Sequence, residues 1–151
     1  MKTGTHFWQA IQGRNIVAQK RLLKRELDDF KAALALKDSA LPRDVQAILE
    51  YIHQHLFEPN LTVIEARRQC GVKNNNITTY FRQLVGMGIR EYIEHRRMQA
   101  AMQLLAHEEL EIFFIGLGIG YSHEESFARA FRRRCGCTPS EYRKEIVKKK
   151  C

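Results

Sequence analysis

Apolar residues recur at intervals of three and four positions through almost the whole chain. In the N-terminal segment they form one stripe, which consists of Ile16, Leu23, Leu27, Phe30 and Leu34. The same spacing returns in each later segment, and no run alternates between apolar and polar residues as a strand would. Because this period places apolar side chains along one face of a helix, the sequence predicts an all-α fold.

Prolines, glycines and helix-capping residues divide the chain into helical segments. Pro42, Pro59 and Pro139 each lie between periodic segments, where proline ends or starts a helix. Thr62 and Ser122 are expected N-caps, because their hydroxyls can accept a hydrogen bond from the first helical turn. With their caps, the expected helices cover about residues 15–38, 43–57, 62–71, 74–85, 89–107, 112–119, 122–135 and 138 onward.

Two stretches share one pattern, in which a short amphipathic helix, a glycine and a brief turn precede a longer helix. They cover about residues 62–86 and 112–135, with turn glycines at Gly71 and Gly120. This pattern is typical of the helix-turn-helix, whose second helix presents a polar face that can enter the major groove of DNA. The predicted linker helix, residues 89–107, is roughly 28 Å long, comparable with the roughly 34 Å between successive major grooves.

The length of 151 residues suits one domain or two small units that share a core, and it excludes a large multi-domain enzyme. We divide the chain into an N-terminal helical extension (1–42), a two-unit core domain (43–147) and a basic tail (148–151). The stripe in the extension, residues 16–34, can pair with a second copy of the chain or pack on the core, and dimerisation is slightly favoured.

A formal net charge of +8 indicates a polyanionic partner, which can be nucleic acid, an anionic membrane surface or an acidic protein. No apolar run approaches the roughly 20 residues that cross a bilayer, and the N-terminus lacks the apolar stretch of a secretory signal. We therefore expect a cytoplasmic protein that does not insert into membranes. A helical adaptor for acidic proteins is an alternative to a DNA-binding protein.

Catalytic and metal-binding patterns are weak in this sequence. The cysteines, Cys70, Cys135, Cys137 and Cys151, lack two pairs at zinc-ligand spacing, so a thiol or zinc sensor is only a second alternative. The glycine-rich segment 116–120 has neither the Lys-Ser/Thr ending nor the preceding strand of a phosphate loop. We predict no cofactor, no metal ion and no enzymatic activity.

The segment from Ile119 to Arg143 resembles the C-terminal signature of the AraC/XylS family of bacterial transcription regulators. The matching runs are Ile119-Gly120-Tyr121-Ser122, Ser126-Phe127-Ala128-Arg129-Ala130-Phe131-Arg132-Arg133 and Gly136-Cys137-Thr138-Pro139-Ser140-Glu141-Tyr142-Arg143. The resemblance covers about residues 43–146. It implies a seven-helix domain with two helix-turn-helix units that act on promoter DNA, mostly as activators that contact RNA polymerase.

The first unit departs from the family pattern at two places. Arg67 stands where the family has a small residue, four positions before the turn glycine, and Gly88-Ile89 stands where the family often has Ser-Pro. We expect the stem of Arg67 to be buried while its guanidinium stays in water.

The resemblance also implies which side chains face DNA. In the first unit the base-contacting residues are Asn75, Thr78 and Thr79, which share one helical face, and Asn and Thr can both bond base edges. In the second unit they are Glu124, Glu125, Ser126 and Arg129, where Arg129 can bind guanine or pair with Glu125 within the helix. The expected backbone-contacting residues are Asn74, Asn76, Arg82, Arg96, Arg97, Ser122, Arg132 and Arg133.

Overall fold

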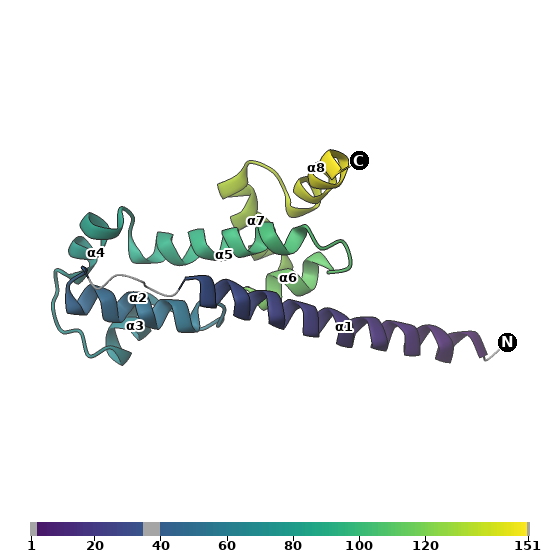
Figure 1. The fold of residues 1–151 in the computed structure, drawn as a ribbon, viewed down its shortest axis with the longest axis horizontal. Helices are drawn as coiled ribbons and strands as arrows, with labels where there is room; N and C mark the ends of the chain where they lie inside the picture. Colours follow the sequence, from purple (N-terminus) through teal and green to yellow (C-terminus); the bar gives the residue numbers. More distant parts are fainter. Residues whose placement is uncertain (1–2, 35–39, 151) are drawn as a thin grey trace.

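The computed structural model describes residues 3–34 and 40–150, with side-chain contacts from Asn15 onward. Over these residues every regular element is a helix, as the apolar period predicts, and Figure 1 shows how the helices are arranged. The helices are α1 (Thr3–Ala33), α2 (Arg43–His55), α3 (Val63–Gln69), α4 (Ile77–Val85), α5 (Ile89–Leu105), α6 (Ile112–Gly118), α7 (Glu124–Cys135) and α8 (Pro139–Lys150).

The N-terminal helix begins twelve residues earlier than the apolar stripe indicates. We predicted a start near residue 15, but α1 begins at Thr3 and contains no proline that would interrupt it. The apolar stripe marks the part of α1 that packs on the rest of the chain. It does not mark the start of the helix, because a helix can continue beyond its packed part. The predicted end near residue 38 and Cys151 lie outside the described residues.

The first unit, α2, α3 and α4, encloses one hydrophobic core together with the first half of α5. Val63 of α3 packs against the buried residues of this core, which come from α2, α4, α5 and the connections between helices: Val45, Ile48, Leu49, Ile52, Leu56, Leu61, Val72, Ile77, Phe81, Ile89, Tyr92 and Ile93. Gly71 adopts a φ of +64° in the turn before α4, a conformation that side chains rarely adopt. This turn sends the chain from α3 into α4, the second helix of the unit.

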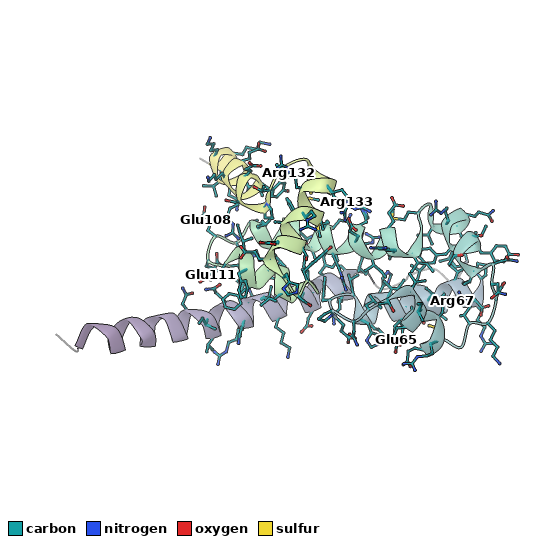
Figure 2. All side chains as sticks on the ribbon, turned by 180° about the vertical axis from the view of Figure 1, so that it is seen from behind. Glu65, Arg67, Glu108, Glu111, Arg132 and Arg133 are labelled. Atoms are coloured by element: carbon teal, nitrogen blue, oxygen red, sulfur yellow. The ribbon has the colours of Figure 1, made fainter. Side chains whose placement is uncertain are left out.

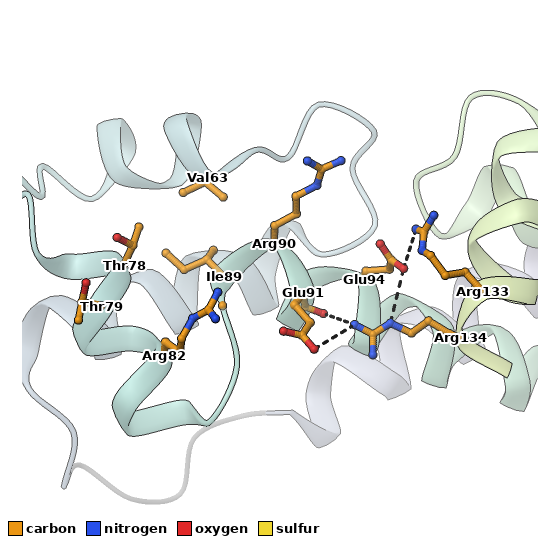
Figure 3. Close-up of a pocket in the computed structure, with 11 residues that line it drawn as sticks. Val63, Thr78, Thr79, Arg82, Ile89, Arg90, Glu91, Glu94, Arg133 and Arg134 are labelled. Atoms are coloured by element: carbon orange, nitrogen blue, oxygen red, sulfur yellow. Dashed lines mark hydrogen bonds and ion pairs between the residues drawn. The ribbon is translucent and has the colours of Figure 1, made fainter.

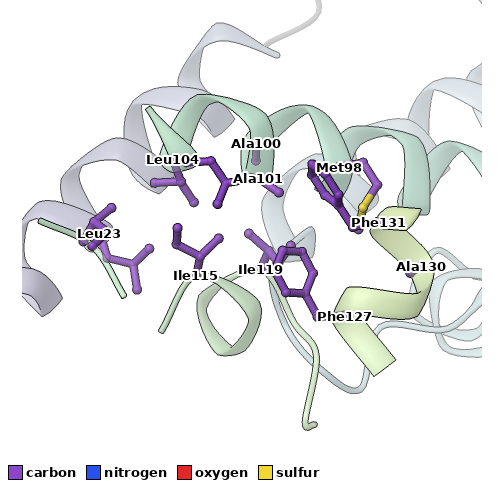
Figure 4. Close-up of a cluster of buried hydrophobic side chains, with 12 residues drawn as sticks. Leu23, Met98, Ala100, Ala101, Leu104, Ile115, Ile119, Phe127, Ala130 and Phe131 are labelled. Atoms are coloured by element: carbon purple, nitrogen blue, oxygen red, sulfur yellow. The ribbon is translucent and has the colours of Figure 1, made fainter. Parts of the chain in front are cut away.

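The second unit, α6 and α7, encloses a separate core with the other half of α5, with α1 and with α8. Figure 4 shows the centre of this core, where Phe127 and Phe131 of α7 lie next to Met98 and Ala101 of α5. Leu23 of α1 belongs to the same buried cluster. The second core therefore includes a residue from outside the helix-turn-helix pattern.

Helix α5 contributes buried side chains to both cores, so it joins the two units directly. Ile89 and Tyr92 lie in the first core, whereas Ala101 and Leu104 lie in the second. The helix has 17 residues, two fewer than predicted, and is about 26 Å long at the usual rise per residue. Because one continuous helix packs into both cores, the separation of the two units follows from its length.

The apolar stripe of α1 packs within the chain. Leu23 fits against Gly118 of α6, where an added Cβ would lie 2.8 Å from the leucine side chain. Phe30 contacts both cores, and its ring lies 5.9 Å from the ring of Phe57. Leu34 packs on the first core. Within the chain, Leu23 is thus buried and Leu27, Phe30 and Leu34 are partly buried, so intramolecular packing uses most of the stripe that could also pair with a second copy of the chain.

A polar contact from α1 reinforces this packing. The side chain of Gln19 is buried, and its Oε1 accepts a hydrogen bond of 2.9 Å from the backbone N–H of Glu111 at the start of α6. Its Nε2 donates to Oδ1 of Asn15 at 3.1 Å. A buried amide with partners for both its oxygen and its nitrogen stabilises the one register in which they meet.

Helix starts follow the sequence signals at two sites and depart from them at two others. Thr62 caps α3 through a 3.1 Å bond from the N–H of Glu65, and Thr138 forms a reciprocal capping box with Glu141 before Pro139. In contrast, α7 has His123 at its N-cap position, so the prediction that Ser122 caps this helix is wrong.

The other departure concerns the start of α4. We predicted a helix from about Asn74, but α4 begins at Ile77. The Oδ1 of Asn74 accepts a 2.9 Å bond from the N–H of Asn76, and this local bond shapes a turn in place of a helical start.

Candidate nucleic-acid interface

The second helices of the two units, α4 and α7, border one cleft above α5. Figure 3 shows this cleft, which has a volume of about 1020 Å³. Its lining residues come from both units and from the linker helix: Val63, Thr78, Thr79, Arg82, Gly88, Ile89, Arg90, Glu91, Glu94, Arg133 and Arg134. Side chains of α4 and α7 that lie more than 50 positions apart in sequence thus face one shared surface.

The predicted base-contacting residues of the second unit all lie on the exposed face of α7. Glu124, Glu125, Ser126 and Arg129 are exposed, whereas Phe127 and Phe131 are buried on the opposite face. Among the ion pairs of the described residues, none joins Glu125 to Arg129. The guanidinium of Arg129 therefore stands toward solvent, where an external acceptor can reach it.

In the first unit, the predicted contact residues divide between the turn and the helix. Thr78 and Thr79 are exposed on α4, where they line the cleft, and Asn75 is exposed in the turn before α4. The predicted helical face of Asn75, Thr78 and Thr79 therefore does not exist as one helical face. All three side chains are nevertheless exposed near the start of α4.

Arg67 holds this turn in place. It is half-buried, and its Nη2 donates to the backbone carbonyl of Asn74 at 3.4 Å. The expectation of a buried stem is consistent with this position, but the head bonds the protein as well as facing water. The departure from the family pattern thus places a cation in the turn just before α4.

The cleft also contains two carboxylates of α5, Glu91 and Glu94, which form its acidic floor and were not predicted from the sequence. The Oε1 of Glu94 accepts a 2.9 Å hydrogen bond from Nη2 of Arg133 and lies 3.5 Å from Nε of Arg134. Arg134 also donates to the backbone carbonyl of Glu91 at 3.1 Å. Glu91 and Glu94 are three positions apart on one helix, so helical spacing alone could have placed them on one face.

Two predicted phosphate-contacting arginines lie outside this cleft. Arg97 is only 8% exposed, and it donates to the carbonyls of Leu56 at 2.8 Å and of Glu58 at 2.7 Å. Burial lowers the pKa of its guanidinium, although two short charge-assisted bonds keep the cation in place. We therefore remove Arg97 from the proposed interface, because its donors satisfy the end of α2 and the turn that follows.

Arg96 lies on another side of α5. It lines a second cleft with Glu26 and Asp29 of α1, and its Nη1 donates to Gln99 at 2.9 Å. Its guanidinium also stands over the ring of Tyr92, at 5.1 Å from the centroid. Because these neighbours belong to α1 and α5, Arg96 is also removed from the proposed interface.

Comparison with known proteins supports a DNA-binding function for this arrangement. Residues 68–145 match the model of a family described as a helix-turn-helix domain. The chain is 31% identical over 102 residues to the regulatory protein SoxS of Salmonella typhimurium, which covers 68% of this chain and 94% of SoxS. The chain belongs to the AraC/XylS family. It is a DNA-binding transcription regulator, and the family is not one of enzymes.

Solved structures from the AraC/XylS family share this fold. The C-terminal domain of AraT, a response regulator from Geobacillus stearothermophilus, is 27% identical, with a TM-score of 0.67 over 71% of this chain and 88% of that domain. The DNA-binding domain of AdpA, solved in complex with a target DNA, superposes with a TM-score of 0.64 at 18% identity, over 72% of this chain and 96% of that domain. The second likeness concerns the fold alone.

The glycines of segment 116–120 serve packing in this AraC/XylS domain. An added Cβ at Gly116 would lie 3.0 Å from the ring of Phe127, and one at Gly120 would lie 2.8 Å from the guanidinium of Arg97. These glycines therefore allow α5, α6 and α7 to approach closely. This segment therefore resembles a phosphate loop only in its glycine content.

Neither the cysteines nor the hydropathy of the helices indicates a further binding site. Burial raises the pKa of the Cys70 and Cys135 thiols, and the Sγ of Cys70 donates to the carbonyl of Ala47 at 3.4 Å. Within residues 3–34 and 40–150, no group of three His, Cys, Asp or Glu residues could hold a metal ion. In the same residues, none of the helices is long and apolar enough to cross a membrane.

Proposed function

We propose that this chain reads promoter DNA with two helices, α4 and α7, that enter successive major grooves on one side of a duplex. The observation that carries the proposal is the shared cleft, because both helices turn exposed polar side chains toward it from the two ends of one linker helix. The linker helix α5 is about 26 Å long, somewhat less than the roughly 34 Å groove repeat. Bending of the DNA toward the protein can close such a difference.

The contact residues are assigned from their exposure on α4, on α7 and in the turns before these helices. Of the assigned residues, Thr78, Thr79, Arg82 and Arg133 line the cleft itself. We assign base reading to Asn75, Thr78, Thr79, Glu124, Glu125, Ser126 and Arg129. Backbone contacts fall to Asn74, Asn76, Arg82, Ser122, Arg132 and Arg133, all of which are exposed. Phosphate contacts position a protein on the duplex and base contacts specify the sequence, so the two sets should fail in different ways when mutated.

Arg129 and Arg132 form a matched pair for testing this assignment, because both are exposed arginines on α7. The operator is first found by selecting bound sequences from a random DNA pool. Arg129→Ala should then lose discrimination at one or two base pairs, by about 1–3 kcal/mol. Arg132→Ala should weaken binding to all sequences alike and reduce the slope of log affinity against log salt by about one. Unchanged discrimination in Arg129→Ala would contradict the base-reading role.

A titration of random duplex at two salt concentrations separates this function from the adaptor alternative. DNA binding that rests on phosphate contacts weakens steeply with salt, because each contact releases counterions. An adaptor for acidic proteins would bind duplex weakly or without that dependence.

Activation through RNA polymerase and a cytoplasmic location are extensions of the same proposal, supported by the family. We infer that one chain suffices to span both grooves, because α1 packs its stripe on the two cores. The stoichiometry of the complex with selected DNA, measured by light scattering, tests this inference, and two chains on one pair of grooves would contradict it.

A further inference from the structure

Glu94 lies at the point where the second recognition helix meets the linker helix. Its carboxylate is shared by two consecutive arginines of α7, Arg133 and Arg134, as Figure 3 shows. The Glu94 side chain is 21% exposed, whereas that of Arg133 is 61% exposed. The carboxylate is thus anchored at the floor of the cleft, and the Arg133 cation bends down to it from the rim.

The two arginines are held differently. Arg134 has three partners: it donates to the backbone carbonyl of Glu91 at 3.1 Å and forms ion pairs with the carboxylates of Glu91 at 3.9 Å and Glu94 at 3.5 Å. Arg133 has Glu94 as its one ion-pair partner within the described residues. Arg134 therefore braces α7 on α5, while Arg133 can leave its partner without exposing any other buried group.

Glu91 and Glu94 line the cleft between α4 and α7, so DNA whose successive grooves held these two helices would bring its backbone over the two carboxylates. A carboxylate in that place repels phosphates, and it also occupies the arginine that a phosphate would otherwise bind. Non-specific binding depends almost entirely on phosphate contacts, so it is the mode that such a carboxylate weakens most. Binding to the correct sequence also depends on the orientation of α7, which the same ion pairs maintain.

We propose that Glu94 is a positioning residue that sets sequence selectivity, because it fixes α7 on α5 and withholds Arg133 from the phosphates of random DNA. This inference rests on the proposed DNA-reading function. It assigns the selectivity of the second unit partly to a side chain on the linker helix, which reads no base itself.

The test compares Glu94→Gln with the wild-type chain on two probes, a random duplex and a duplex selected from a random pool. Glu94→Gln should bind random duplex about two- to five-fold more tightly, the range expected for releasing an exposed ion pair. The slope of log affinity against log salt on random duplex should steepen by about 0.9, which corresponds to one additional phosphate contact. Affinity for the selected duplex should rise less or fall, so the ratio between the two probes decreases.

Glu108→Gln is the matched control, because it removes the same charge from the turn after α5, far from Arg133 (Figure 2). This variant should leave the ratio between the probes unchanged. The gain on random duplex should also disappear when Arg133→Met is added to Glu94→Gln, since the freed cation is then absent. A gain that persists in the double variant would overturn the proposal.

A second pair of variants does not depend on the folding of Glu94→Gln. Arg132→Met and Arg133→Met both remove an exposed cation from α7, but only Arg133 is paired with Glu94. On random duplex, Arg132→Met should lower the salt slope by about 0.9 and Arg133→Met by clearly less. Equal losses, or an unchanged probe ratio in Glu94→Gln, would overturn this inference alone. Failure of the wild-type chain to bind any duplex would overturn the proposed function and this inference together.

Discussion

The two helix-turn-helix units share one turn geometry but differ in how tightly they are packed. The turn glycines, Gly71 and Gly120, both have positive φ values, of +64° and +105°. A Cβ added at Gly71 would meet no atom within 4 Å, whereas one at Gly120 would lie 2.8 Å from Arg97. The first glycine is required for its backbone conformation alone, and the second also provides space.

The second unit is also braced from outside its own pattern. Helix α1 contributes Gln19 to the start of α6 and Leu23 to the space above Gly118, and α5 holds α7 through two arginines. The first unit has an open turn of three asparagines and a short recognition helix of nine residues. Both units pack on α1 and α5, but only in the second unit do residues from these helices fill the space next to the glycines of its first helix and turn.

The largest predicted effect compares the two turn glycines. Gly120→Ala should lower the free energy of unfolding by about 2–5 kcal/mol, because a left-handed alanine is strained and its Cβ collides with a guanidinium held by two carbonyls. Gly71→Ala should cost only about 1–2 kcal/mol, from the backbone conformation alone. Urea denaturation of both variants measures the difference, and equal losses would show that the packing of the two turns does not differ energetically.

Arg97→Met is expected to have the next largest effect. It leaves the carbonyls of Leu56 and Glu58 without their buried donor, which should cost about 2–4 kcal/mol. Arg90→Met on the exposed side of the same helix should change stability by less than about 0.5 kcal/mol. If Arg97→Met were as stable as the wild type but had a shallower salt dependence for DNA, the original assignment to phosphate would be restored.

Gln19→Ala removes the hydrogen bond from Glu111 to α1. It should lower the free energy of unfolding by about 1 kcal/mol, the usual contribution of one hydrogen bond. Hydrogen exchange should accelerate at the amides that begin α6 and remain unchanged in α2, because the lost acceptor serves Glu111. Lys20→Ala, at the exposed neighbouring position, is the control. Equal exchange in α6 for the two variants would argue against a brace from α1.

The smallest predicted effect is a pH dependence that belongs to the first unit. The ring Nε2 of His53 lies 2.6 Å from the hydroxyl of Tyr92, and burial, together with the nearby Arg96, lowers the pKa of His53 while Glu50 opposes the shift. The unfolded chain then takes up this proton first, so stability should fall as pH decreases below the ordinary histidine value of about 6.5. Urea denaturation as a function of pH should show a shallower fall in His53→Gln. The pKa of His95 is also lowered, so this residue should account for part of the pH dependence that remains in His53→Gln.

Much of the fold could be predicted because its signals are local. The helical period, Thr62 and Pro139 placed most helices within a few residues of their observed bounds. The start of α4 was wrong because Asn74 bonds the backbone two residues later, a competition that apolar spacing does not reveal. The residues of α7 that the family resemblance predicts to face DNA are exposed, because Phe127 and Phe131 occupy the buried face of this helix.

The parts that could not be predicted depend on contacts between distant segments. Arg97 looked like a phosphate-binding residue because its carbonyl partners, Leu56 and Glu58, lie about 40 positions away. The counter-ions Glu91 and Glu94 were missed because their arginines belong to another helix. The sequence around an arginine does not show whether its partner is a phosphate of DNA or a backbone carbonyl of the same chain.

By itself, the sequence determined that this protein is helical, that it repeats a helix-turn-helix and that it belongs with regulators that read DNA, because periodicity, turn glycines and signature residues are properties of neighbouring positions. Only the tertiary structure decided which arginines are bonded within the chain, where α1 packs and which carboxylates line the cleft. These depend on how α5 brings the two units together, and that arrangement arises from burial of two cores on one helix.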